Sequence, residues 1–275
     1  MPAISLTPSS VSSRTVVSAD QFKIQPQFEE AIFQTLREVQ GFHELVVTDL
    51  PQGWEGFLWE VEESLPLIRK THDPTSRTLR LKIMPTYTHN CVAEWISSSI
   101  SRASATGFLN LAELDLLLLQ SGTLLSFVNG SYRGLRKEPD ALIHTPSQPF
   151  PTLVAEVGWA ESYEDLLDDM NKLLVGGNGA IKIVLLVKWT RHSNNSVTGV
   201  LELYRNDRQG IPQLRQTEVI FPQPAGNPPQ PLDIQRCDLY PARPPRNPNE
   251  HFPLLVNRLR YHAQISLTRQ GYVPA

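Results

Sequence analysis

Two short apolar runs joined by a proline-rich turn set the tightest limit on how this chain folds. Residues 141–143 read Ala-Leu-Ile, residues 153–155 read Leu-Val-Ala, and three prolines lie between them. Apolar runs of this length, bounded by turn residues, are typical of neighbouring strands in one sheet. Asp140 precedes the first run and Glu156 follows the second. We therefore expect their two carboxylates to converge at one edge of a sheet.

Converging carboxylates limit the chemistry of such an edge. Each negative charge raises the pKa of the other unless a cation lies between them. Hard carboxylate oxygens suit Mg²⁺ or Mn²⁺, so Asp140 and Glu156 are the expected ligands of a metal-dependent phosphodiesterase site. The alternative is a turn aspartate and a surface glutamate. A glutamate at the end of a nearly continuous apolar run is less typical of an exposed position, because such strands are buried on both faces.

The order of motifs extends beyond these two acids. In chain order it reads Pro139-Asp140, Glu156-Val157-Gly158, Ser162 with acidic neighbours, Asn178-Gly179, and an apolar run at 181–189. Over roughly residues 75–205 this order resembles the PD-(D/E)XK nuclease superfamily, most closely its bacterial "putative restriction endonuclease" branch and fungal relatives. The resemblance implies an α/β fold, a mixed central sheet flanked by helices with a restriction-endonuclease-like core. It also implies Mg²⁺-dependent phosphodiester hydrolysis.

The lysine of this family needs a different position here. The usual Glu-x-Lys would place it at 158, where the chain has Gly158. In the branch it resembles, the lysine is often found on the next helix, four residues after an aspartate, as in Asp168 and Lys172. Lys182 is the other candidate. A non-catalytic protein that keeps the fold as an interaction module is the second hypothesis.

The helix that carries Lys172 is predicted over about 161–175. Its apolar stripe consists of Leu166, Leu167, Met170, Leu173 and Leu174. At about 100° per residue, Lys172 lies nearly opposite the centre of this stripe, so the pattern predicts a solvated lysine. The acidic residues of the first turns, with Ser162 or Glu161 near the cap, are interpreted as complementing the helix dipole.

Basic residues and net charge bear on nucleic-acid binding. Formal net charge is −3, so any such binding requires a local basic patch. Arg133, Arg136 and Lys137 directly precede the Asp140 motif and are candidates for contacts with a phosphate backbone. The alternative for these three is a charged strand on a solvated face, and the sequence leaves both interpretations open.

The rest of the chain is predicted to form one domain with extensions. Other elements expected inside the domain are helices at 27–40 and 89–102, a hairpin around Asn129-Gly130, and strands at 79–83, 181–188 and 200–204. Ten of the 23 prolines lie between residues 222 and 253, which favours an extended strap. The expected division is a disordered Ser/Thr-rich leader at 1–22, the domain at 23–210, a strap at 211–250 and a closing helix at 251–275.

Cysteine usage and the N-terminal composition indicate an intracellular protein. Cys91 and Cys237 are isolated, which argues against a zinc site and against a disulfide-stapled secreted domain. The first 20 residues lack the apolar core of a secretory signal. No apolar run is long enough to cross a bilayer, so no membrane partner is expected.

Overall fold

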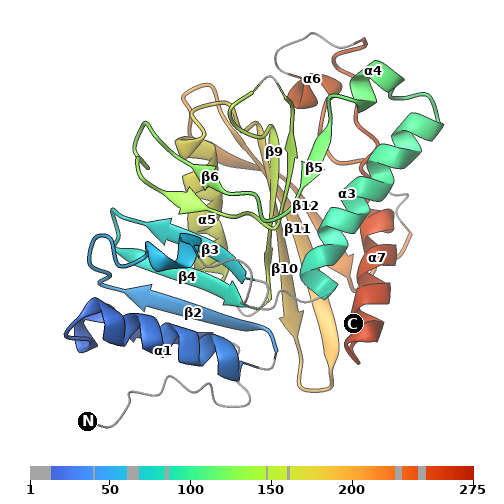
Figure 1. The fold of residues 1–275 in the computed structure, drawn as a ribbon. Coiled ribbons are helices and arrows are strands. Elements are labelled where there is room, and N and C mark those ends of the chain that lie inside the picture. Colours follow the sequence, from blue (N-terminus) through green and yellow to red (C-terminus); the bar gives the residue numbers. More distant parts are fainter. Residues whose placement is uncertain are drawn as a thin grey trace. The chain divides into compact units, whose positions relative to one another are not determined.

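A computed structural model describes residues 14–39, 41–60, 68–83, 87–146, 148–159, 162–226, 231–240 and 246–275 (Figure 1). The chain divides into two compact units. The first unit comprises residues 1–86 and 124–138, and the second comprises residues 87–123 and 139–275. Each unit has its own mixed sheet, so the expectation of an α/β protein with mixed strand pairing is confirmed. The expectation of one central sheet is wrong, because two sheets form.

The first unit is a six-stranded sheet with one long helix. Its strand order is β1-β2-β4-β3-β7-β6, with β1 parallel to β2 and the other pairs antiparallel. Its elements are β1 (Arg14–Ser18), α1 (Gln25–Glu38), β2 (His43–Thr48), α2 (Phe57–Glu60), β3 (Ile68–Asp73), β4 (Thr78–Ile83), β6 (Leu125–Ser126) and β7 (Arg136–Lys137). The apolar side of α1, with Phe28 and Ile32, packs in one cluster with Leu45, Val47 and Leu79.

Alternate residues of the same strands are charged. Glu44 pairs with Lys82 across β2 and β4, and Val46 pairs with Arg80. Glu44 is fully buried and forms ion pairs with Arg14 and Arg80, each at 3.6 Å. The period of two that buries leucine and valine on one side of this sheet therefore places a buried ion-pair network on its other side.

The second unit is built on a seven-stranded sheet in the order β12-β11-β10-β9-β8-β5, with β13 paired to β11. Strands β9 and β10 are parallel and β8 is antiparallel to β9. Its strands are β5 (Leu118–Gln120), β8 (Ala141–His144), β9 (Leu153–Gly158), β10 (Ile183–Arg191), β11 (Ser196–Asn206), β12 (Pro212–Phe221) and β13 (Val273–Pro274). Its helices are α3 (Tyr87–Ala105), α4 (Leu111–Leu114), α5 (Tyr163–Gly176), α6 (Arg236–Leu239) and α7 (Val256–Arg269).

Helices α3 and α7 cover one face of this sheet and lie side by side in Figure 1. Trp95 of α3 donates its indole N–H to the carbonyl of Leu255 at 3.0 Å, which ties the start of α7 to α3. Fully buried β-strand residues on this face include Leu153, Ala155 and Val157. Helix α5 packs on β9, β10 and β11 from the opposite face.

Most predicted elements form close to their expected bounds. The predicted helices at 27–40, 89–102 and 161–175 correspond to α1, α3 and α5, and the predicted strands at 79–83, 181–188 and 200–204 to β4, β10 and β11. Helix α5 begins after Ser162, whose hydroxyl accepts from the Asp165 N–H, and its C-cap is Gly177. Glu161, the other predicted cap residue, lies outside the described residues.

Three segments differ from expectation. Residues 14–18, expected in a disordered leader, form β1, which pairs with β2. Residues 212–221, expected in a strap, form β12, whose single proline, Pro212, is its first residue, a position that a strand tolerates. Strands β6 and β7 pair, as the predicted hairpin requires. The last bond before the loop runs from the Phe127 N–H to the Leu135 carbonyl at 2.9 Å, so Asn129-Gly130 lies in a wider loop and not in a two-residue turn.

Candidate functional site

Strand register brings the two predicted acids side by side on neighbouring interior strands of the second sheet. The β8–β9 ladder pairs Ala141 with Ala155, and extending it by one residue places Asp140 beside Glu156. The Asp140 carboxylate accepts a hydrogen bond from the backbone N–H of Val157 at 2.8 Å. Residues opposite each other in an antiparallel pair project from the same face. Both residues are buried: Asp140 is 7% exposed and Glu156 is 1% exposed.

Glu156 projects from the face that α5 covers. Its strand neighbours Ala155 and Val157 belong to the apolar cluster on the opposite face, and side chains alternate along a strand. Gly158 shares the Glu156 face, and a Cβ added there would lie 2.6 Å from the Cδ1 of Leu166. The space that the family's lysine would use is therefore filled by a leucine of α5.

Lys172 is buried, which corrects the prediction of a solvated lysine. Its side chain is 9% exposed, and its ammonium pairs with the Asp168 carboxylate at 2.7 Å. The helical wheel failed because it treated the apolar stripe as the whole buried arc of α5. The buried arc of α5 is rotated to include Asp169 and Lys172 with the apolar residues. The arc thus has an apolar half and a polar half.

Lys182 lies at the wrong end of its strand to serve as the third member of the site. Glu156 pairs with Leu186 in the parallel ladder, four residues beyond Lys182. At about 3.3 Å per residue, this offset is about 13 Å. The ammonium of Lys182 donates instead to the carbonyl of Gly179 in the turn after α5. Of the two candidate lysines, only Lys172 is on an element that packs over Glu156.

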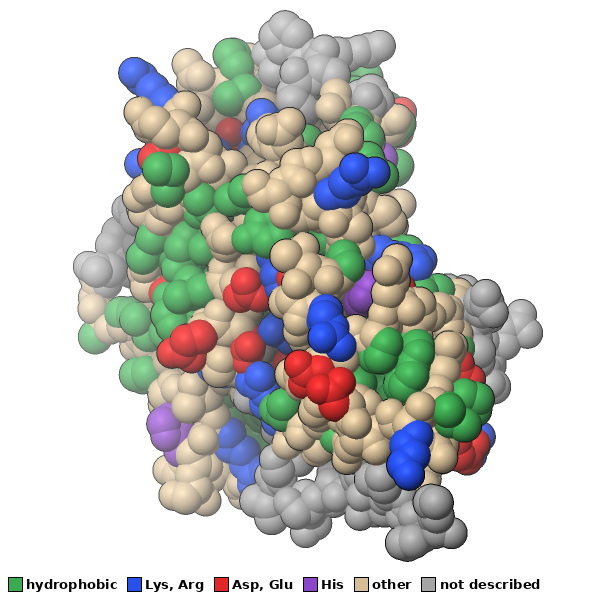
Figure 2. Space-filling view, turned by 90° about the vertical axis from the view of Figure 1, so that its left-hand side faces the viewer, with side chains coloured by type: hydrophobic (Ala, Val, Ile, Leu, Met, Phe, Trp, Pro, Cys, Tyr) green, Lys and Arg blue, Asp and Glu red, His purple; other side chains and the backbone are tan. Residues whose placement is uncertain are grey.

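The three predicted phosphate-binding residues do not share one environment. All three belong to the first unit, and the boundary between the units falls after Glu138. Arg133 is exposed, Arg136 stacks on the Trp59 ring at 3.9 Å, and Lys137 is buried with its ammonium 3.4 Å from the Thr71 hydroxyl. Figure 2 shows basic and acidic side chains interspersed on the face that it draws.

The donor set at Asp140 and Glu156 fits Mg²⁺ in type and number. Protein sites commonly hold this ion by one or two carboxylates, with waters and substrate phosphates completing an octahedron. Within the described part of the chain, no group of three or more His, Cys, Asp or Glu side chains is arranged to hold a metal ion.

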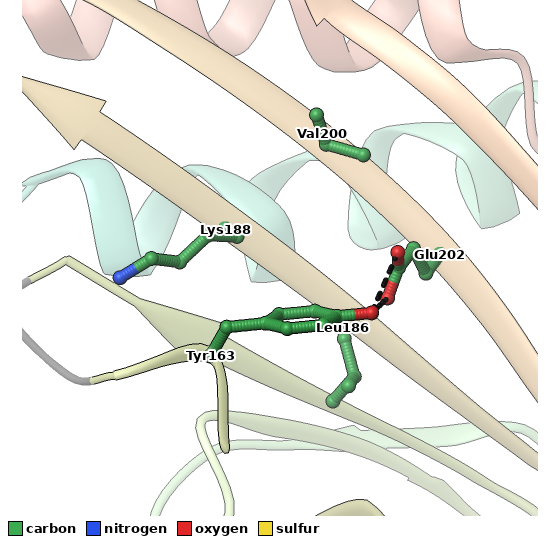
Figure 3. A pocket seen from close by; sticks show the side chains of 5 residues that line it. All are labelled: Tyr163, Leu186, Lys188, Val200 and Glu202. Carbon is green, nitrogen blue, oxygen red and sulfur yellow. Dashed lines mark hydrogen bonds between the residues drawn. The ribbon is translucent and has the colours of Figure 1, made fainter. Parts of the chain in front are cut away.

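Beside the carboxylates, a small hollow opens on the same face. It is about 160 Å³ in volume and is lined by Tyr163, Leu186, Lys188, Val200 and Glu202 (Figure 3). Sequence reasoning gave no role to Tyr163 or Glu202. The available signal was the alternation of Val200, Glu202 and Tyr204, which places all three on one face of β11.

Hydrogen bonds fix the polar end of the hollow. The Tyr163 hydroxyl lies 2.9 and 2.8 Å from the two Glu202 oxygens, and the Tyr204 hydroxyl donates to Glu202 at 3.0 Å. Burial is the main cause of a raised pKa for the Tyr204 hydroxyl, with the Tyr163 and Glu202 hydrogen bonds adding to it. Burial also raises the pKa of Tyr163. Both phenols therefore remain protonated donors well above neutral pH.

Comparison with known protein families, curated proteins and solved structures gives no significant match. No helix in the described ranges is both long and apolar enough to cross a membrane.

Proposed function

We propose that this protein is a Mg²⁺-dependent phosphodiester hydrolase acting on nucleic acid, with a restriction-endonuclease-like core in its second unit. The observation that carries the proposal is the register of β8 and β9, which sets Asp140 beside Glu156 on one buried face. Mn²⁺ is an alternative to Mg²⁺ for the same oxygen ligands.

The order of elements supports this assignment. A strand follows Pro139-Asp140, a second strand ends in Glu156-Val157-Gly158, a helix with acidic first turns comes next, and a glycine turn leads into a further apolar strand. This is the order that the family resemblance implies. The β9-α5-β10 connection joins two parallel neighbours, as a crossover helix does.

Each residue has a defined task in the proposed reaction. Asp140 and Glu156 would bind the cation, which supplies Lewis acidity and lowers the pKa of a bound water. Lys172 would direct its ammonium toward the attacking water or toward the charge that develops on the phosphate. The Asp168 carboxylate holds that ammonium at 2.7 Å and so restricts its position. Separately from this site, Arg133, exposed in the first unit, is proposed as a contact of that unit with a phosphate backbone.

The test compares cleavage with metal binding in matched variants. Purified protein with Mg²⁺ or Mn²⁺ should nick DNA or RNA, and Asp140→Ala or Glu156→Ala should lower the rate at least about 100-fold, since metal stabilisation is worth several kcal/mol. Lys172→Met should lower it while Lys182→Met does not. Glu164→Ala removes an exposed acid of α5 and serves as the control. Cleavage that persists in both carboxylate variants would contradict the proposal.

A non-catalytic interaction module is the second candidate, and the packing at Gly158 favours it. Leu166 fills the space that a lysine at position 158 would occupy. The substitute lysine, Lys172, comes from helix α5 rather than from β9. If calorimetry detects no Mn²⁺ binding to the wild-type protein and no nicking occurs, the module replaces the hydrolase. Mn²⁺ binding that Asp140→Ala abolishes would favour the hydrolase.

A further inference from the structure

The hollow beside the carboxylates has the features of a binding site for a flat ring. Its walls come from the first residue of α5 and from two adjacent strands, all within the second unit (Figure 3). Leu186 and Val200 supply apolar surface, and Tyr163, a residue that is 39% exposed, supplies an aromatic ring. Aromatic rings with one accessible face are the usual stacking platforms of proteins for planar groups.

The Tyr163 ring is held in place before any ligand arrives. Its hydroxyl contacts both oxygens of Glu202 and lies 3.2 Å from the Tyr204 hydroxyl. The backbone of Tyr163 is anchored at the start of α5, directly after the Ser162 cap. A ring fixed at both ends loses little conformational entropy on binding, so stacking energy is converted efficiently into affinity.

The position of the hollow relates it to the proposed reaction. Leu186 is the direct neighbour of Glu156 in the β9–β10 ladder, and Glu202 is the direct neighbour of Leu186 in the β10–β11 ladder. Two strand spacings, about 10 Å, therefore separate the backbones of Glu156 and Glu202. A nucleic-acid strand with a phosphate at the carboxylates can thus direct an adjoining base toward Tyr163.

We propose that this hollow binds one unpaired nucleobase of a single-stranded nucleic acid, stacked on Tyr163 and hydrogen-bonded at its edge to Glu202. The proposal rests on the proposed function for the nature of the substrate. Base–aromatic stacking tolerates any sequence. A base within a duplex is paired and stacked, so only an unpaired base can reach a protein pocket without unstacking.

Glu202 adds a chemical preference. A carboxylate accepts hydrogen bonds at about four lone-pair positions and donates none. The hydroxyls of Tyr163 and Tyr204 occupy only part of the accepting capacity of Glu202. The remaining lone pairs can accept hydrogen bonds from the N–H groups of guanine or cytosine, but they cannot bind a base edge that carries acceptors alone. Lys188 lines the rim on the other side of the ring and adds a cation near the strand's phosphates.

The experiment measures stacking without cleavage. The full chain is titrated into a single-stranded oligonucleotide that carries one 2-aminopurine, first in EDTA and then in Ca²⁺. This fluorescent base has an exocyclic amino donor, and stacking quenches it. We expect wild-type protein to quench it and Tyr163→Leu to weaken binding about tenfold or more. Tyr163→Phe keeps the ring but loses the hydrogen bonds to Glu202, so its affinity should fall between the two.

A matched tyrosine controls for nonspecific loss. Tyr261 of α7 is 52% exposed and lies outside the hollow, so Tyr261→Leu should bind as wild type does. Thermal melting checks that each variant is folded. Equal binding by Tyr163→Leu and Tyr261→Leu, or no quenching by the wild type, would overturn the base site. Quenching without any Mg²⁺-dependent cleavage would remove the hydrolase but leave the base site, whereas Mg²⁺-dependent cleavage without quenching would remove the base site but leave the hydrolase.

Discussion

The two faces of the seven-stranded sheet perform different tasks. On the face beneath α3 and α7, the inward residues of β9 and β10 are apolar and fully buried, among them Leu153, Ala155 and Leu185. On the α5 face, the same strands present Glu156 and Lys188, and β11 presents Glu202. The α3/α7 face is thus apolar along these strands, whereas the α5 face combines buried apolar residues such as Val154 and Leu186 with polar groups. The α5 face is free to keep polar groups that folding alone does not require.

The largest effect should come from placing a charge on the apolar face. Ala155→Asp buries an unpaired carboxylate between β8 and β10 at a position that is fully buried. Its cost of several kcal/mol is comparable with the total stability of a domain. We expect loss of cooperative melting and of soluble yield. Glu202→Gln on the other face keeps an acceptor oxygen and should cost about 1 kcal/mol. Similar losses for both variants would contradict the division between the faces.

An intermediate effect is expected from placing a lysine at position 158. In Gly158→Lys, the new Cβ would lie 2.6 Å from Cδ1 and 3.1 Å from Cγ of Leu166, which is fully buried. Overpacking of this kind costs about 1–3 kcal/mol, measured by urea unfolding, and Gly158→Ala should show most of it. Leu166→Ala creates room, so the Gly158→Ala/Leu166→Ala pair should lose less than the sum of the two singles. Strict additivity would show that these positions do not meet.

The smallest effect is chemical and leaves stability unchanged. Cys91 belongs to the cluster on the apolar face, and burial raises the pKa of its thiol, with the Glu94 charge adding to the shift. Cys237 is half-buried, and its pKa is also raised, chiefly by burial. Since the thiolate is the reactive form, a chromogenic thiol reagent should modify Cys237 slowly at pH 7 and faster at pH 9. Cys91 should react only after unfolding, and its prompt labelling would show that the apolar face is open.

Sequence periodicity predicted individual elements better than their partners. The spacing of Phe28, Ile32 and Leu36 located α1 because a helix that packs on any core repeats its apolar residues in this way. The same spacing does not say which sheet the helix covers, so one central sheet was expected where two form. Pairings such as β1 with β2 depend on contacts distant in sequence, which no local pattern reports.

For the candidate site too, the sequence indicated single residues but not the contacts between distant ones. Asp140 and Glu156 were recognisable because each borders an apolar strand, and strands have a simple register. The burial of Lys172 could not be predicted from the sequence. An ion pair with Asp168, four residues earlier, looks the same in the sequence whether the lysine is buried or on the surface. Tyr163 and Glu202 meet across 39 residues, and only the folded sheet brings them together.

The covering of the apolar face has a consequence for the synthesis of the chain. Helix α3 ends at Ala105 and α7 begins at Val256, so about 150 residues are made between the two helices that close this face. At 5–20 residues per second, translation takes about 8–30 s to bridge that interval. During this time α3 is already available to cover β8 and β9, but the apolar side of β12 that α7 contacts stays uncovered. Ribosome-bound chains that stop short of α7 should therefore depend on chaperones far more than chains that include it.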